Sequence, residues 1–213
     1  MTSPKRFFQS PEPIILPEGT PLVFLEGPVQ GAPDWQTPFA HRLLEAVPNI
    51  AVASPRVTPE HEANLKSADP AIKKLASERQ VAYEFLARRL ALRFGATALW
   101  YATQDMSLPY PEGRRFGKTT PIENGEIWGW MMAHPDYPFI VGFDPDMLEG
   151  GENSRGYISR NHELIGIPEY SSLDDVFNAT VVAVEKITDE DSRPVPSSTS
   201  QSIQRALDRL GSE

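Results

Sequence analysis

Apolar residues along the chain follow two repeating patterns. Short continuous apolar runs predict buried strands at residues 22–25, 49–53, 97–101 and 139–143, with a minor fifth strand at 165–168. Between these runs, apolar positions recur every three to four residues and predict helices over 34–46, 70–93, 122–133 and 172–186, with a short helix near 154–160. Strands that alternate with helices indicate an α/β protein.

The predicted fold is a three-layer sandwich, flavodoxin-like or Rossmann-like, with a mostly parallel sheet of about five strands. Residues 21–187 hold all the predicted strands and are expected to form one α/β domain. Residues 1–20 are expected to form an extended, poorly ordered arm, whose Phe7 and Phe8 can dock on the body or on a neighbouring subunit. Residues 188–213 are predicted to be a polar linker followed by a short C-terminal helix.

The composition is typical of a soluble globular protein, with 40% hydrophobic and 23% charged residues. No stretch approaches the roughly 20 apolar residues that a membrane helix needs. The first residues also lack the apolar core of a signal peptide, so we expect a cytoplasmic protein without a membrane partner. The net charge of −9 repels phosphate polymers, and we therefore expect no nucleic-acid partner.

The residue types exclude several kinds of chemistry. The chain has no cysteine, which excludes thiolate nucleophiles and cysteine-based metal sites. Its histidines do not pair at the spacing of a zinc-binding helix, and they stand apart at His41, His61, His134 and His162. We therefore expect no metal and no cofactor.

A basic loop at residues 113–119 resembles a phosphate-binding loop without being one. Its sequence GRRFGKT has three residues between the glycines where that motif needs four, so ATP or GTP hydrolysis is not expected. Arg114, Arg115 and Lys118 nevertheless precede the helix that begins near Ile122. Cations at a helix N-terminus suit a single phosphate group, and a solvated loop is the alternative.

Parallel α/β sheets bind ligands beyond the carboxyl ends of their strands. Glu26, Gly27, Pro28 and Asp34 follow the first predicted strand, and Asp105 follows the third. We therefore expect these residues to lie near a ligand. Asp34 is also well placed to cap the helix that follows it.

Three motifs follow one another along the chain. The first predicted strand reads Phe24-Leu25-Glu26-Gly27-Pro28 and is followed by Asp34-Trp35-Gln36. The long helix carries Gln80 and then Tyr83-Glu84, and the next helix begins Pro121-Ile122 and continues to Glu126. In order and rough spacing, over residues 22 to about 145, the chain resembles the nucleoside 2-deoxyribosyltransferase-like family. It departs from the family at Glu26, where a small residue is usual, and at Trp128, where glycine is common.

The resemblance implies cleavage or transfer at the N-glycosidic bond of a nucleoside or nucleoside 5′-monophosphate. Such a reaction builds positive charge at the anomeric carbon, which a carboxylate stabilises or attacks. By resemblance, Glu126 is the nucleophile, and Glu123 on the same helix face is the competing candidate. Glu84 and Asp105 are candidates for assisting the departing base.

The remaining expectations concern binding and assembly. The residues predicted to bind the substrate are Phe24, Glu26, Gly27, Pro28, Asp34, Trp35, Arg114, Arg115, Lys118, Thr120 and Glu123. Phe24 and Trp35 would stack on a nucleobase, although residues of this type are more often part of the core. The family resemblance also implies a homo-oligomer with a shared active site, to which Phe7-Phe8 and the segment near Tyr157 could contribute.

Several functional alternatives remain open. The acceptor of the sugar can be a second base or water, which makes the enzyme a transferase or a hydrolase. Other readings are a non-catalytic nucleotide-sensing module of the same fold, a glycohydrolase that cleaves NAD, and an interaction protein without a small ligand.

Overall fold

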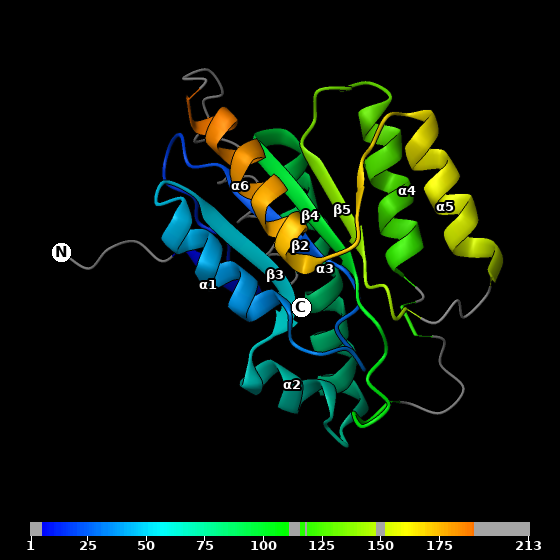
Figure 1. The fold of residues 1–213 in the computed structure, drawn as a ribbon. Coiled ribbons are helices and arrows are strands. Elements are labelled where there is room, and N and C mark those ends of the chain that lie inside the picture. Colours follow the sequence, from blue (N-terminus) through cyan, green and yellow to red (C-terminus); the bar gives the residue numbers. More distant parts are fainter. Residues whose placement is uncertain (1–5, 111–115, 118, 148–151, 190–213) are drawn as a thin grey trace.

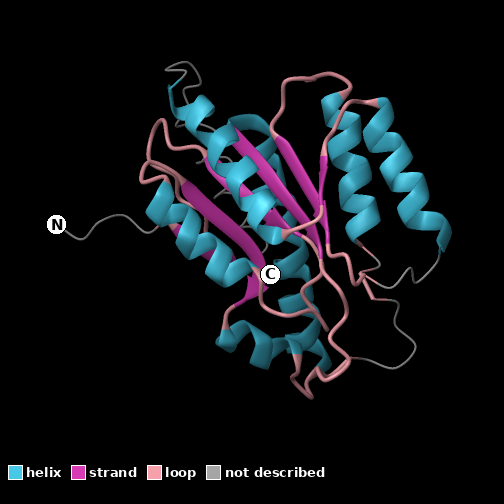
Figure 2. Cartoon of the chain, viewed as in Figure 1, coloured by secondary structure: helices cyan, strands magenta, loops and turns pink. Residues whose placement is uncertain are grey.

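The computed structural model describes residues 6–110, 116–117, 119–147 and 152–189, which form a parallel sheet with helices on both faces (Figure 1, Figure 2). The predicted α/β three-layer class is confirmed, with six strands in the sheet where about five were expected. The strands are β1 (Phe7–Ser10), β2 (Leu22–Glu26), β3 (Ala51–Val57), β4 (Gly95–Tyr101), β5 (Phe139–Phe143) and β6 (Glu169–Tyr170). Every neighbouring pair is parallel, in the order β1-β3-β2-β4-β5-β6.

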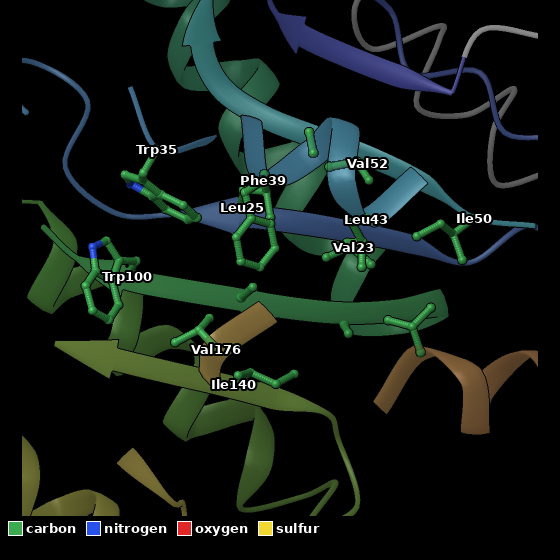
Figure 3. Packing of buried hydrophobic residues seen from close by; sticks show 14 of the residues in the cluster. Val23, Leu25, Trp35, Phe39, Leu43, Ile50, Val52, Trp100, Ile140 and Val176 are labelled. Atoms are coloured by element: carbon green, nitrogen blue, oxygen red, sulfur yellow. The ribbon is translucent and has the colours of Figure 1, made fainter. Parts of the chain in front are cut away.

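The helices divide between the two faces of the sheet. They are α1 (Gln36–Ala46), α2 (Pro59–Leu65), α3 (Pro70–Phe94), α4 (Thr120–Met131), α5 (Glu152–Leu164) and α6 (Leu173–Asp189). On one face, α1 and α6 bury a core cluster with β2 and β4, and Figure 3 shows Phe39 and Leu43 of α1 with Val176 of α6 in this layer. On the other face, α3 packs against β2 and β3, while α4 and α5 pack against β4 and β5.

The strands read as continuous apolar runs because both faces of the sheet are covered. In β2, Val23 and Leu25 pack with α1, whereas Leu22 and Phe24 pack with α3. Since successive side chains point to opposite faces, Glu26 at the end of β2 lies on the α3 face. This alternation decides which helices can reach the candidate site.

The N-terminal segment was expected to be a poorly ordered arm, but part of it belongs to the sheet. Residues Phe7–Ser10 form β1, which pairs with β3 and adds an edge strand to the sheet. Phe8 is buried in the same cluster as Ile14 and Leu16, and Tyr83 of α3 donates a hydrogen bond to the Phe8 carbonyl at 2.9 Å. The aromatic pair therefore docks on the body of its own chain.

Other boundaries shift for local reasons. The strand predicted at residues 49–53 is β3, and it continues to Val57. Pro55 is accommodated there because the pairing of β3 with β1 changes register at this point. The short helix α2 was not predicted, although Thr58 caps it by accepting from the His61 amide and Pro59 begins it. The last strand is Glu169–Tyr170, just beyond the expected 165–168. The expected C-terminal helix and most of the linker lie outside the described residues.

Strand order reverses at β2, which has β3 on one side and β4 on the other. Apart from the edge strand β1, this is the flavodoxin-like order, in which ligands bind beyond the carboxyl ends of the two central strands. Glu26 ends β2 and Tyr101 ends β4 at this point. Within the described residues, no helix combines the length and apolar character needed to cross a bilayer.

Candidate functional site

Arg88 of α3 is the centre of the candidate site, and sequence reasoning missed it. Its Nε donates to Oε1 of Glu26 at the end of β2, and its Nη1 donates to Oε2 of Glu126 on α4 at 2.8 Å. Its Nη2 lies 3.5 Å from Oε1 of Glu123, also on α4. One guanidinium thus joins carboxylates from a strand and a helix at the point where strand order reverses. The arginine fork is suited to this arrangement because its donors lie in one plane.

The local structure explains how these side chains meet. Glu123 and Glu126 are three residues apart on α4 and therefore share one side of that helix. Arg88 follows Glu84 by one helical turn on α3, beside the buried stripe that contains Ala87. Packing of α3 against β2 then brings Arg88 to Glu26, because Glu26 points to the α3 face.

Burial sets the proton affinities of the innermost carboxyl groups. Desolvation raises the pKa of Glu26, whereas the Arg88 charge lowers it and the nearby Glu123 raises it further. Burial likewise raises the pKa of Glu123, opposed by Arg88 and reinforced by repulsion from Glu126. Oε2 of Glu26 is buried and has no hydrogen-bond partner among the described residues. The cluster therefore favours protonation of some of its carboxyl groups near neutral pH.

Glu84 adds a carboxyl group that titrates near neutrality. Burial raises its pKa to about 7, while the hydrogen bond from Gln80 lowers it and repulsion from Glu123 raises it. Gln80 Nε2 donates to Glu84 Oε1 at 2.9 Å, one turn earlier on α3. A group with this pKa can both hold and release a proton under physiological conditions.

Glu126 differs from its neighbours in accessibility. Its side chain is 51% exposed, compared with 17% for Glu123 and 1% for Glu26. Of the three carboxylates that contact Arg88, Glu126 is therefore the most open to a ligand. An accessible carboxylate next to carboxyl groups that retain protons is the arrangement used in glycosidic chemistry.

Two predicted acidic residues lie apart from this cluster. Asp105 is exposed, and its carboxylate accepts from the hydroxyl and the backbone amide of Ser107, which lowers its pKa. Asp34 accepts from the Thr37 amide at 3.0 Å and pairs with Arg56. Asp34 thus satisfies an amide in the first turn of α1, although the N-cap position itself is Trp35, and neither acidic residue is paired with Arg88.

The two predicted stacking residues are core residues. Phe24 is buried against α3, and Trp35 is buried on the opposite face of the sheet, where it packs edge-to-face on Phe39. Their ring faces are therefore covered in this structure, and they do not form one sandwich around a base. Nε1 of Trp35 is a buried donor without a partner among the described residues.

The remaining predicted binding residues shape the turn after β2 and the start of α4. Gly27 has a φ of 137°, and a Cβ there would lie 2.2 Å from the Trp100 carbonyl oxygen. Pro28 is buried and its carbonyl accepts from Gln36 Nε2 at 3.4 Å, while Thr120 is buried at the first turn of α4. Arg114, Arg115 and Lys118 lie outside the described residues.

A sequence signal for Arg88 did exist. Gln80, Glu84 and Arg88 recur at intervals of four and line one side of α3. The adjacent Arg89 is exposed, however, and this spacing does not show which of the two arginines is buried. Only the position of β2 decides which of them is buried against an acid.

Two further comparisons, of the described residues with metal-binding arrangements and of the chain with known proteins, found no match. No group of three or more acidic or histidine side chains in the described part of the chain is arranged to hold a metal ion. No protein-family model matches the chain, and no curated protein matches it. The fold and site define an α/β protein of flavodoxin-like strand order with an arginine-centred carboxylate cluster at the carboxyl ends of its central strands.

Proposed function

We propose that the chain cleaves or transfers the N-glycosidic bond of a nucleoside or nucleoside 5′-monophosphate, as the motif resemblance implies. The observation that carries the proposal is the exposed carboxylate of Glu126, which Arg88 holds at the carboxyl ends of β2 and β4. This is where an α/β sheet of this order binds small ligands.

The proposed chemistry assigns separate roles to two carboxyl groups. The carboxylate of Glu126 attacks the anomeric carbon, or stabilises its positive charge, as the bond to the base breaks. Glu84, whose pKa is raised to about 7, gives its proton to the departing base. An incoming base or water then displaces Glu126 and returns a proton to Glu84, which restores both groups.

Arg88 has two opposing effects on this reaction. Its charge keeps the Glu126 carboxylate oriented, but the same hydrogen bond makes that carboxylate a weaker nucleophile. The hydrogen bond between Arg88 and Glu126 favours the second candidate function. In that case the protein is a nucleotide-sensing module whose site binds a nucleotide without cleaving it. A ligand that displaces Arg88 from Glu126 would favour catalysis.

The test is release of free base, followed by chromatography, from a panel of nucleosides, nucleoside 5′-monophosphates and NAD. We expect wild type to release base and Glu126→Gln to lose at least about a hundredfold in rate. The exposed Glu163 on α5 provides a matched control, and Glu163→Gln should retain wild-type activity. Release that survives Glu126→Gln would refute the assignment of Glu126, and release of nicotinamide alone would identify a NAD glycohydrolase.

Binding without release separates the sensor from the enzyme. Calorimetry with the same panel should then show saturable binding in wild type while chromatography shows intact ligand. If wild type neither binds a member of the panel nor releases base, the remaining hypothesis is an interaction protein without a small ligand.

We further propose a homo-oligomer, because the family resemblance implies one. Phe7 and Phe8 are used within their own sheet, so they do not supply the contact. Tyr157 on α5 is 68% exposed and is the remaining aromatic candidate. Sedimentation showing a monomer at micromolar concentration would argue against this assembly, and Tyr157→Ser tests whether the tyrosine contributes.

A further inference from the structure

A second polar cluster joins α4 and α5 to the sheet, and none of its hydrogen bonds involves Arg88. His162 of α5 is fully buried, with the rings of Trp128, Phe139 and Phe143 around it. Its Nδ1 lies 2.6 Å from Oε1 of Glu169 on β6, and its Nε2 lies 3.1 Å from Nδ2 of Asn124 on α4. Four elements therefore meet in this cluster, because Asn124 Nδ2 also donates to the Tyr101 hydroxyl of β4 at 3.0 Å.

The hydrogen bonds have one consistent direction. A carboxylate oxygen of Glu169 can only accept, so Nδ1 of His162 carries a proton and donates to it. Nε2 of a neutral imidazole is then an acceptor, and it receives a hydrogen from the Asn124 amide nitrogen. Burial lowers the pKa of His162, against the opposing effect of Glu169, which favours this neutral form.

Tyr101 ends the chain of hydrogen bonds as an acceptor. Its hydroxyl oxygen receives the Asn124 hydrogen, so its own hydrogen is directed elsewhere. Its ring is fixed by stacking on Phe143, with centroids 4.5 Å apart and planes 2° from parallel. No acceptor for the phenol hydrogen occurs among the hydrogen bonds of the described residues.

Tyr101 and Glu26 of the Arg88 cluster end neighbouring strands at the same edge of the sheet. Tyr101 ends β4 on the same face of the sheet as Glu26, because Glu26 pairs with Leu99 and Tyr101 is two residues further along. Burial raises the pKa of Tyr101, and the charges of Glu123 and Glu26 raise it as well. The phenol is therefore a neutral donor close to those carboxyl groups.

We propose that Glu169, His162 and Asn124 are positioning residues that hold the Tyr101 hydroxyl as a hydrogen-bond donor facing the Arg88 carboxylate cluster. Asn124 lies between Glu123 and Glu126 in α4, so the same chain also fixes the helix that carries them. The donor's contribution to turnover rests on the proposed function, whereas the direction of the hydrogen bonds does not.

Lowering the pH should reverse the direction of the hydrogen bonds that join His162, Asn124 and Tyr101. A protonated His162 donates from both nitrogens, so Nε2–H requires an acceptor on Asn124. The amide oxygen of Asn124 already lies 3.3 Å from Nε2, and rotation of the amide would bring it between His162 and Tyr101. The phenol hydrogen would then be donated to Asn124 and withdrawn from the site. Among the charged groups of the described residues, Glu169 is the one hydrogen-bonded to His162.

Long-range proton–nitrogen NMR of the imidazole rings tests the direction in the whole protein without any ligand. His162, assigned with His162→Gln, should be neutral at pH 7 with its proton on Nδ1. Asn124→Asp, whose side chain only accepts, should raise the pKa of His162 by at least one unit, which is tenfold in proton affinity. Should that variant fail to fold, Glu169→Gln should instead lower the pKa. Glu163→Gln is the control and should leave the signals unchanged, whereas a wild-type proton on Nε2, or a charged ring at pH 7, would overturn the proposal.

A second measurement addresses the Tyr101 donor. Tyr101→Phe keeps the ring stack but removes the hydroxyl, so it should leave the His162 signals in place and lower kcat for base release by about ten- to a hundredfold. If wild type releases no base while the NMR result is as expected, the proposed function fails and the positioning chain stands. If wild type releases base and Tyr101→Phe does so at the same rate, the donor role is overturned.

Discussion

Arg88 on α3 and Glu126 on α4 are 38 residues apart in the chain and form a charge-assisted hydrogen bond of 2.8 Å. The guanidinium is largely buried, whereas the carboxylate is half exposed. The pair therefore spans the boundary between the core and the surface at the carboxyl ends of the central strands. This asymmetry makes the arginine structurally important and leaves the glutamate accessible.

Replacing Arg88 should destabilise the protein strongly. Arg88→Met removes the cation that compensates buried Glu26, and we expect a loss of about 3 kcal/mol in the free energy of unfolding at pH 8. Urea denaturation measures the loss. The neighbouring Arg89 provides the control, since Arg89→Met removes an exposed arginine next to Phe85 and should cost under about 0.5 kcal/mol. Equal effects of the two substitutions would contradict the central role of Arg88.

The raised pKa of Glu84 makes stability depend on pH in a defined direction. The folded state holds a proton up to about pH 7, whereas the ordinary pKa is 4.5, so the folded state binds more protons between these values. The contribution of Glu84 to the free energy of unfolding therefore falls as the pH rises through this window. Glu84→Gln should remove a decline on the order of 2 kcal/mol between pH 4.5 and pH 8.

Chemical denaturation of wild type and Glu84→Gln across that range measures the difference. The exposed carboxylate of Glu78, on the same helix, allows a matched control, and Glu78→Gln should leave the wild-type pH dependence in place. A constant offset between wild type and Glu84→Gln at every pH would contradict the raised pKa.

Gly27 is required by the close approach of β2 and β4. Gly27→Ala would place a Cβ 2.2 Å from a backbone oxygen at a φ of 137°, so we expect a loss of at least about 2 kcal/mol. Gly125 on the exposed side of α4 has open space at its Cβ position, and Gly125→Ala should stabilise the helix by about 0.5–1 kcal/mol. Thermal unfolding of both variants provides the comparison, and a destabilising Gly125→Ala would show that α4 is packed differently.

Arg56 fixes the loop between β2 and α1. Its Nε donates to Gln36 at 2.9 Å and lies 2.7 Å from Asp34, while its Nη2 donates to the Pro33 carbonyl at 2.6 Å. Arg56→Met should increase amide hydrogen exchange in residues 29–35 and cost about 1–2 kcal/mol of stability. Arg42→Met, which breaks an exposed pair with Asp174, should change neither quantity measurably. Unchanged exchange in Arg56→Met would show that the loop is held by other contacts.

The sequence alone predicted most of the architecture because each signal was local. The apolar runs at Leu22 and Phe139 marked buried strands, and the long helical repeat from Pro70 marked α3. Ser172, where the last helix was predicted to begin, accepts from the Asp175 amide and donates to its carboxylate in a capping interaction. The edge strand β1 escaped prediction because its four residues are too short to show a period and its pairing partner lies more than forty residues away.

The sequence by itself determined most of the elements, the α/β class and the edge of the sheet where acidic residues gather, because apolar periodicity and the alternation of strands and helices are local properties of the chain. Tertiary structure decided which acids share a site. Glu26 and Glu126 meet because one buried arginine reaches both, whereas Asp34 and Asp105 at the same edge are used by their own loops. Burial and pKa depend on contacts between distant segments, and no pattern within one segment records them.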